Sequence, residues 1–148
     1  MSTAYAVTSQ DLRNDAAIAA EHRLRGKIPD EELEKCVKSI RTATNKYSAG
    51  GSVICALFYW RITLDSQGKH YTGNAGGIGG LGGGSTNGDI YTDNWDRLVR
   101  EATSFEFNSA FVYLNVNFFN KDSQFLGHYQ GGGVGICGGI GGGTGSFS

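Results

Sequence analysis

The stretch His70-Tyr71-Thr72-Gly73-Asn74-Ala75-Gly76-Gly77-Ile78-Gly79-Gly80-Leu81-Gly82-Gly83-Gly84-Ser85 occurs in this chain in two versions. The second version begins His128-Tyr129-Gln130-Gly131, continues through Ile136 and ends Ile140-Gly141-Gly142-Gly143-Thr144. Together the segments 73–88 and 127–145 hold 20 of the 24 glycines. The preceding residues repeat as well, because Asp65-Ser66-Gln67 corresponds to Asp122-Ser123-Gln124. Flexible linkers do not normally repeat together with their flanking residues. The sequence therefore predicts that a single folded module is present in two copies.

Each copy belongs to a half of about four strands, over residues 53–88 and 103–147. Val53–Leu64 alternates in the manner of one strand, Asp65–Gly68 is a turn, Lys69–Ala75 runs back, and Asn87-Gly88 indicates a hairpin. A short helix, capped by Thr92 or Asp93, is expected between the halves. We therefore predict a mainly β fold, a closed eight-stranded antiparallel barrel of two Greek-key-like repeats. Closure removes the exposed sheet edges, the glycines allow strands to cross closely, and the interior is expected to be filled by side chains.

The N-terminal part is predicted to be a helical extension over residues 1–48, followed by the barrel domain at 49–148. Helix is expected in two pieces over residues 8–48, broken at Gly26, with Pro29 at the first position of the second piece. Leu33, Val37 and Ile40 recur at helical spacing and form a narrow amphipathic stripe. Such a stripe normally packs on its own domain or on a partner, and only rarely lies in a membrane.

Charge, hydropathy and cysteine spacing argue against several classes of protein. Thirteen Lys and Arg against 14 Asp and Glu give a net charge of -1, which argues against a nucleic-acid partner. No transmembrane segment and no classical signal peptide are visible in the sequence. Cys36, Cys55 and Cys137 show no C-x-x-C spacing; the sequence favours buried thiols, and a Cys55–Cys137 disulfide stays open.

Nothing in the motifs predicts catalysis. Two G-x-G-x-x-G matches, at 77–82 and 133–138, lack the helix that a dinucleotide site requires. His70 and His128 occupy equivalent places in the two copies, so we interpret them as strand residues that the module kept, and whether either has a further role stays open. Glu106 lies inside an alternating strand and is expected to face solvent or the barrel wall. We predict no catalytic, cofactor-binding or metal residues, no cofactor, and no enzyme activity.

Several segments resemble the virulence-associated protein (Vap) family of the horse pathogen Rhodococcus. They are the stretches at 88–98, 104–107, 113–119 and 125–130 and the terminal Gly141-Gly142-Gly143-Thr144-Gly145-Ser146-Phe147-Ser148. The resemblance covers about Val53 to Ser148. It implies a compact barrel of two Greek-key-like halves with a short helix between them, secretion, no known enzyme activity, and a role at host phagosomal or endolysosomal membranes.

The leading hypothesis is therefore a non-catalytic interaction protein that acts on a lipid membrane or on a protein partner. The alternative is an intracellular protein–protein binding barrel whose helices at 8–48 dock a partner. A small-ligand barrel or an enzyme is a third reading, and it would require a cavity with converging polar groups. The sequence leaves the oligomeric state, the molecular target and the export route open.

Overall fold

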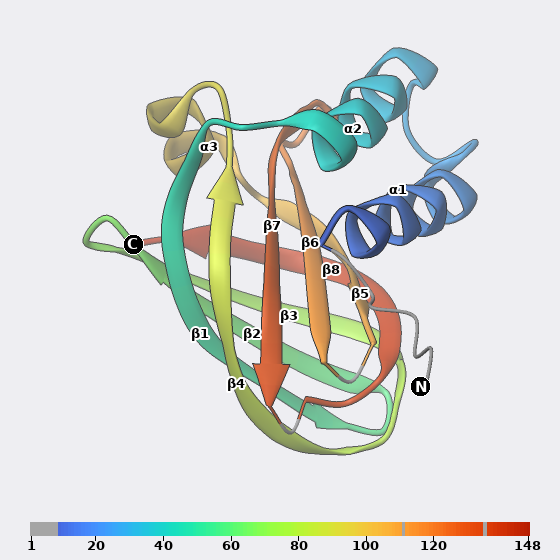
Figure 1. Ribbon diagram of the computed structural model, residues 1–148, viewed down its shortest axis with the longest axis vertical. Coiled ribbons are helices and arrows are strands. Elements are labelled where there is room, and N and C mark those ends of the chain that lie inside the picture. The colour runs from blue at the N-terminus through green and yellow to red at the C-terminus, as the bar shows by residue number, and fades with distance from the viewer. Residues whose placement is uncertain (1–8, 111, 135) are drawn as a thin grey trace, which may run out of the picture.

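The computed structural model describes residues 9–110, 112–134 and 136–148. Its elements, in chain order, are α1 (Ser9–Leu24), α2 (Asp30–Thr42), β1 (Lys46–Ala56), β2 (Tyr59–Ser66), β3 (Lys69–Gly79), β4 (Leu81–Tyr91), α3 (Trp95–Glu101), β5 (Ser104–Ser109), β6 (Tyr113–Phe119), β7 (Phe125–Val134) and β8 (Gly139–Phe147). The eight strands form a closed antiparallel barrel, with α3 between its halves and α1 and α2 packed outside it (Figure 1).

The strand order confirms that the two halves are copies. Around the barrel the order is β1-β2-β3-β8-β5-β6-β7-β4. Within each half, the fourth strand returns beside the first, which is the order of a Greek key. The halves join at two seams, β3 with β8 and β4 with β7, so the glycine-rich strands of one copy pair with those of the other.

The glycines permit close packing at these seams. A Cβ at Gly77 would lie 2.5 Å from the Ile140 carbonyl, and a Cβ at Gly88 would overlap the Gln130 carbonyl. Gly79 and Gly139 similarly leave room for the ring of Trp60, which is fully buried. The interior is filled by aromatic and aliphatic side chains, as predicted for a barrel of this size.

Three local predictions for the barrel were wrong. Val53–Leu64 is not one strand, because the chain turns at Leu57, whose φ is 61°, and continues as β2. Asn87-Gly88 makes no hairpin and instead lies inside β4, paired with β1 and β7. The side chain of Asn94, rather than Thr92 or Asp93, caps α3 by accepting from the Arg97 amide at 3.1 Å.

The N-terminal helices form a hairpin, which we call the α1–α2 hairpin. Gly26, with φ of 83°, lies between the helices as expected, while Pro29 is the N-cap of α2 and not its first residue. The helix ends at Thr42 and β1 begins at Lys46, so the tail of the predicted helical segment is strand. The predicted segment also includes residues 1–8, which lie outside the described residues. α2 lies against β7 and α1 against β5, so the hairpin covers one outer face of the barrel.

Candidate functional site

Exposed apolar side chains gather at the end of the barrel away from the helices. This is the lower end of the ribbon in Figure 1. The turns β1–β2, β3–β4, β5–β6 and β7–β8 meet there. We call this surface the apolar pole and define it by Ile54, Leu57, Phe58, Tyr59, Ile78, Leu81, Val112, Val134 and Ile140, each 43–77% exposed. Leu81 and Phe58 are 74% and 73% exposed, so most of each side chain faces solvent.

Backbone groups of neighbouring turns at this end are hydrogen-bonded to one another. The surface that faces solvent is therefore formed mainly by side chains. The Leu57 amide donates to the Gly80 carbonyl at 2.9 Å, and the Gly79 amide donates to the Leu57 carbonyl at 3.1 Å. The Gly77 amide bonds the Phe58 carbonyl at 3.2 Å. The β1–β2 turn is therefore fixed against the β3–β4 turn, with its polar backbone groups bonded between the turns.

Charge is absent from all four segments that build the apolar pole. Residues 47–60, 75–88, 107–120 and 129–148 contain no Asp, Glu, Lys, Arg or His. Arg61, the register partner of Ile54, marks the edge of the surface. The other charged residues of the barrel lie toward the helical end or on its wall, so the barrel has one charged and one uncharged end.

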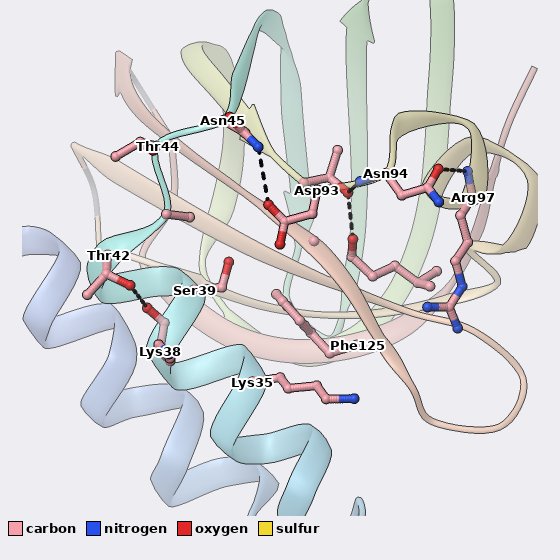
Figure 2. A pocket seen from close by; sticks show the side chains of 14 residues that line it. Lys35, Lys38, Ser39, Thr42, Thr44, Asn45, Asp93, Asn94, Arg97 and Phe125 are labelled. Atoms are coloured by element: carbon pink, nitrogen blue, oxygen red, sulfur yellow. Dashed lines mark hydrogen bonds between the residues drawn. The ribbon is translucent and has the colours of Figure 1, made fainter.

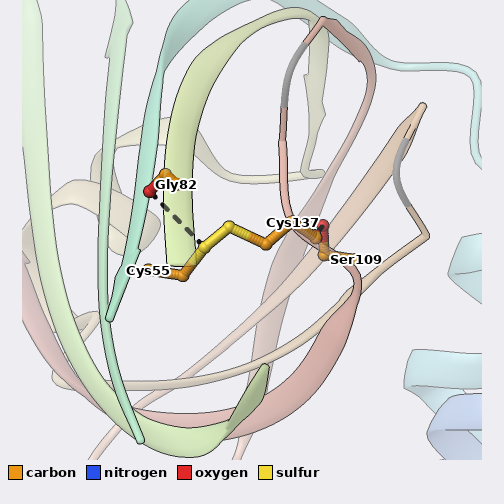
Figure 3. Close-up of a disulfide and its surroundings, with 4 residues drawn as sticks. All are labelled: Cys55, Gly82, Ser109 and Cys137. Atoms are coloured by element: carbon orange, nitrogen blue, oxygen red, sulfur yellow. Dashed lines mark hydrogen bonds between the residues drawn. A yellow bond between two sulfur atoms is a disulfide. The ribbon is translucent and has the colours of Figure 1, made fainter. Parts of the chain in front are cut away.

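A disulfide lies just inside the apolar pole (Figure 3). It joins Cys55 of β1 to Cys137 in the connection between β7 and β8, with the two Cα atoms 6.6 Å apart. Ser109 donates to the Cys137 carbonyl at 2.6 Å and holds this connection from the other side. The preference for three free thiols was therefore wrong for this pair. Cys36, in α2, is free and buried, as the sequence analysis expected.

A cleft of about 450 Å³ opens at the opposite, helical end, between the end of α2 and the β4–α3 connection (Figure 2). Several of its polar side chains are bonded within the protein. Asn45 donates to Asp93 at 3.3 Å, and Thr42 donates to the Lys38 carbonyl at 2.7 Å. Lys35 pairs with Glu32 at 3.0 Å. Ser39 of α2 also lines the cleft, and its Oγ lies 3.1 Å from Nδ1 of the buried His128.

The two equivalent histidines have different surroundings. His70 is exposed and its Nδ1 lies 2.5 Å from Asp65. His128 is fully buried beneath α2, bonded to Ser39 and Gln130 and stacked on Tyr91. They do not form a common site, and the described residues contain no group of three or more acidic, His or Cys side chains placed to hold a metal.

Glu106 is buried, which corrects the expectation that it faces solvent or the barrel wall alone. It is 7% exposed because α1 covers it, and Arg23 of α1 donates to it at 3.2 Å. Burial raises the pKa of the Glu106 carboxyl, and the Arg23 charge partly opposes this rise. Its partner is thus a helix residue that no local pattern around Glu106 could indicate.

The barrel, its order of strands and its glycine seams match a known family. A family model described as the Rhodococcus equi virulence-associated protein matches residues 6–148. The chain belongs to this family. The match extends further toward the N-terminus than the resemblance found from Val53 onward, and includes the α1–α2 hairpin.

Two solved Vap structures are similar to the chain. VapB from the intracellular pathogen Rhodococcus equi shares 36% identity with a TM-score of 0.65, covering 70% of this chain and 96% of that one. VapD from the same pathogen shares 32% identity with a TM-score of 0.67, covering 72% and 100%. No curated protein matches the chain. Among the described helices, none has the length and hydropathy that crossing a bilayer requires.

The apolar pole was not predicted from the sequence. Phe58 and Tyr59 are exposed, while Trp60 beside them is buried. The signal that could have found the surface is that four separate uncharged segments each contain a turn, and that alternate turns of an antiparallel barrel meet at one end.

Proposed function

We propose that this Vap protein is a non-catalytic binding protein that attaches to membrane surfaces through its apolar pole. The observation that supports the proposal is the concentration of exposed aliphatic and aromatic side chains on one uncharged end. Monomeric proteins seldom expose a continuous apolar surface of this kind without a use for it, and such surfaces mark protein or membrane contacts.

The chemistry of the apolar pole favours a bilayer. Leu57, Phe58, Ile78 and Leu81 are exposed on turns at the end of the barrel, and Ile78 and Leu81 are flanked by glycine, so these side chains can enter the boundary between headgroups and acyl chains. Tyr59 adds an aromatic ring with a polar tip, the type of side chain enriched at membrane interfaces. Because the segments lack Lys and Arg, attraction to anionic lipid should contribute little.

The disulfide supports secretion. Disulfides persist in oxidising compartments and are rare in the cytosol. Cys55–Cys137 therefore fits a protein exported from the cell that makes it, and the family resemblance points to host phagosomal or endolysosomal membranes as its place of action.

Co-sedimentation with vesicles tests the proposal. The full chain is mixed with phosphatidylcholine vesicles and with vesicles that also contain phosphatidylserine, and a triple variant, Phe58→Ser with Ile78→Ser and Leu81→Ser, is compared. The matched control is Ile18→Ser, which removes a side chain that is 59% exposed on α1, away from the apolar pole. We expect binding to both vesicles that the triple variant loses and the control keeps.

Two results would count against this function. If the wild-type chain sediments with neither vesicle at any pH between 5 and 7.5, the membrane proposal fails. If it binds and the triple variant binds equally, attachment uses another surface. A protein partner held by the apolar pole would instead appear as a complex that the same triple variant abolishes in the absence of lipid.

A further inference from the structure

The α1–α2 hairpin covers a face of the barrel that is unusually polar for a buried surface. All seven residues of β6 are buried, because one side of the strand faces the barrel interior and the other lies beneath the hairpin. The outward side chains of this covered face include Glu106, Asn115, Asn117, His128 and Gln130, each at most 7% exposed. A face of this composition could equally well be in contact with water.

Much of this polar face is bonded within the barrel and does not depend on the hairpin. Asn115 and Asn117 donate to each other at 3.1 and 3.2 Å, and Asn115 also reaches the Tyr129 carbonyl at 3.2 Å. Tyr113 donates to the Gln130 amide oxygen. The groups that do bond the hairpin are Glu106, His128, Gln130 and the Phe125 amide, and after release they would bond water instead.

The hairpin in turn packs mainly on itself. Its apolar cluster contains Ala16, Ala17, Ala20, Leu24, Leu33, Cys36, Val37 and Ile40 from the helices, and Tyr113, Phe119 and the partly buried Phe125 from the barrel. Arg13 of α1 donates to the carbonyls of Ile40 and Ala43 at 2.6 and 2.9 Å, which ties α1 to the end of α2. The two helices thus form a unit that can move together.

His128 is the titratable group at the centre of the contact between hairpin and barrel. Gln130 uses its amide nitrogen to donate to the Ile40 carbonyl at 3.1 Å and to His128 Nε2 at 2.8 Å. Since Nε2 accepts this bond, the neutral ring carries its proton on Nδ1, which lies 3.1 Å from Ser39 Oγ of α2. The contacts therefore select the neutral imidazole.

Protonation would break this arrangement. A proton on Nε2 would face the Gln130 amide nitrogen, donor against donor, and the ring would become charged without contact with water. The groups packed against it are Arg13 of α1, Ser39 of α2, Tyr91 of β4 and, as its register partner, Asn117 of β6. Of these only Arg13 is charged, and it is a cation. Burial, followed by the Arg13 charge, lowers the pKa of His128 to about 3.

We propose that the α1–α2 hairpin is a detachable cover that is released from the outer face of β5, β6 and β7 in weak acid through protonation of His128. The inference does not depend on the membrane function, because it concerns a different surface. The sign follows from linkage: the neutral ring favours the docked state above pH 6.5, and this contribution is lost as the pH falls below that value. Glu106 acts in the opposite direction, because a raised pKa favours the docked state at lower pH.

Cys36 reports the release. It is fully buried in the apolar cluster that the helices share with Tyr113 and Phe119 of β6. Burial, followed by the charge of Glu106 of β5, raises the pKa of its thiol, so Cys36 lies close to the barrel and loses cover when the hairpin leaves. Since Cys55 and Cys137 are joined, it is the free thiol of the full chain. Its labelling by 4,4′-dithiodipyridine, which reacts with thiols in weak acid, is measured from pH 7.5 to 5 and divided by the rate for the denatured chain at each pH. With a pKa of about 3 docked and 6.5 released, the ratio should rise by up to about 30-fold, less the opposing effect of Glu106.

Substitution of each histidine assigns the effect. We expect His128→Gln, which cannot take up the proton, to abolish the pH dependence, while His22→Gln and His70→Gln, on exposed side chains, keep it. Hydrogen exchange of β1 and β2 is followed in parallel and should remain slow, which distinguishes release of the hairpin from unfolding of the barrel. If His128→Gln does not fold, His128→Asn replaces it.

The proposal is overturned if labelling of the wild-type chain does not accelerate toward pH 5. It is equally overturned if His128→Gln accelerates as the wild type does, or if the amides of β1 and β2 lose protection in step with the thiol. Failure of vesicle binding would leave this result unaffected, so the two proposals fail separately.

Discussion

Gly131 and Gly132 are neighbours in β7, and we predict that the same substitution has opposite consequences at the two positions. A Cβ at Gly131 would lie 2.7 Å from the Asn87 carbonyl and would overlap the hydroxyl of Tyr129. A Cβ at Gly132 would point outward and meet the Val112 carbonyl at 3.8 Å, an ordinary contact. Neither position has a backbone conformation that requires glycine, so space alone separates them.

The Tyr129 ring cannot move aside without cost. It is fully buried, and its hydroxyl shares a hydrogen bond of 2.6 Å with Thr86. Overpacking a filled core costs about 1–3 kcal/mol, and loss of a buried hydrogen bond adds about 1 kcal/mol. Gly131→Ala should therefore lower the free energy of unfolding by about 2–4 kcal/mol, which corresponds to a fall in Tm of roughly 6–12 °C for a chain of this size.

Gly132→Ala should be neutral or should stabilise the fold by about 0.4–1 kcal/mol, because alanine has less freedom in the unfolded chain. Urea titration and thermal melting, both followed by circular dichroism, measure the two variants against the wild type. Equal destabilisation by both substitutions would show that the strand needs glycine for its backbone, and would refute the argument from space.

Three further predictions concern the disulfide, an ion pair and the hydrogen bonds of Arg13. Reduction of Cys55–Cys137, or replacement of both by Ser, should lower stability by at most about 4.5 kcal/mol, as expected for a crosslink spanning 82 residues, and an unchanged melting temperature would contradict a crosslinked native state. Arg23→Ala should destabilise the chain by about 3 kcal/mol at pH 7, because it leaves the buried Glu106 carboxylate without the cation that pairs with it. That loss should shrink as the pH falls toward 5 and Glu106 takes up a proton, and it should be smaller in a Glu106→Gln background; urea titration at both pH values decides. Arg13→Ala, which removes the donor to the last carbonyls of α2, should speed labelling of the α2 thiol at pH 7.5 by roughly tenfold, for a loss of about 1.4 kcal/mol, and an unchanged rate would show that Arg13 does not hold the hairpin together.

The architecture could be predicted because it is encoded in patterns that repeat. Two copies of one glycine-rich segment, each following the same turn residues, indicate two equal halves whatever the details of each strand. The turn at Asp65–Gly68 was predicted because its signal is local: Gln67 and Gly68 take φ values of 52° and 75°.

The turn at Leu57 has no such signal. Ala56-Leu57-Phe58-Tyr59 contains none of the residues that favour turns. The turn is held instead by bonds between Leu57 and Gly79 and Gly80, which lie at the connection from β3 to β4. Asn87-Gly88 shows the reverse: its residues favour a turn, but the ladders to β1 and β7 override that preference, and Gly88 serves the close approach to Gln130.

His70 and His128 show how far a repeat can mislead about environment. Both precede a buried tyrosine in equivalent strands, yet one is exposed and the other is sealed beneath a helix. The difference arises because α2 packs against β7, the strand that carries His128, while His70 of β3 is exposed. The sequence repeat thus predicts the backbone of both copies. The α1–α2 hairpin has no second copy, and its position determines that His128, rather than His70, is buried.

The same asymmetry explains how one barrel can carry two independent surfaces. The apolar pole is made by turns of both halves: Ile78, Leu81, Val134 and Ile140 come from the duplicated glycine segments, and its other residues come from the uncharged segments 47–60 and 107–120. The covered face of β5, β6 and β7 belongs to one half and depends on a hairpin of alternating charge, in which acidic and basic residues are nearly balanced. A change of pH therefore acts at the hairpin, where His128 and Glu106 lie, and leaves the uncharged apolar pole without a group that can respond. Membrane attachment of the wild-type chain should then vary little between pH 5 and 7.5 unless release of the hairpin itself adds a second contact with the bilayer, in which case the variation should disappear in His128→Gln.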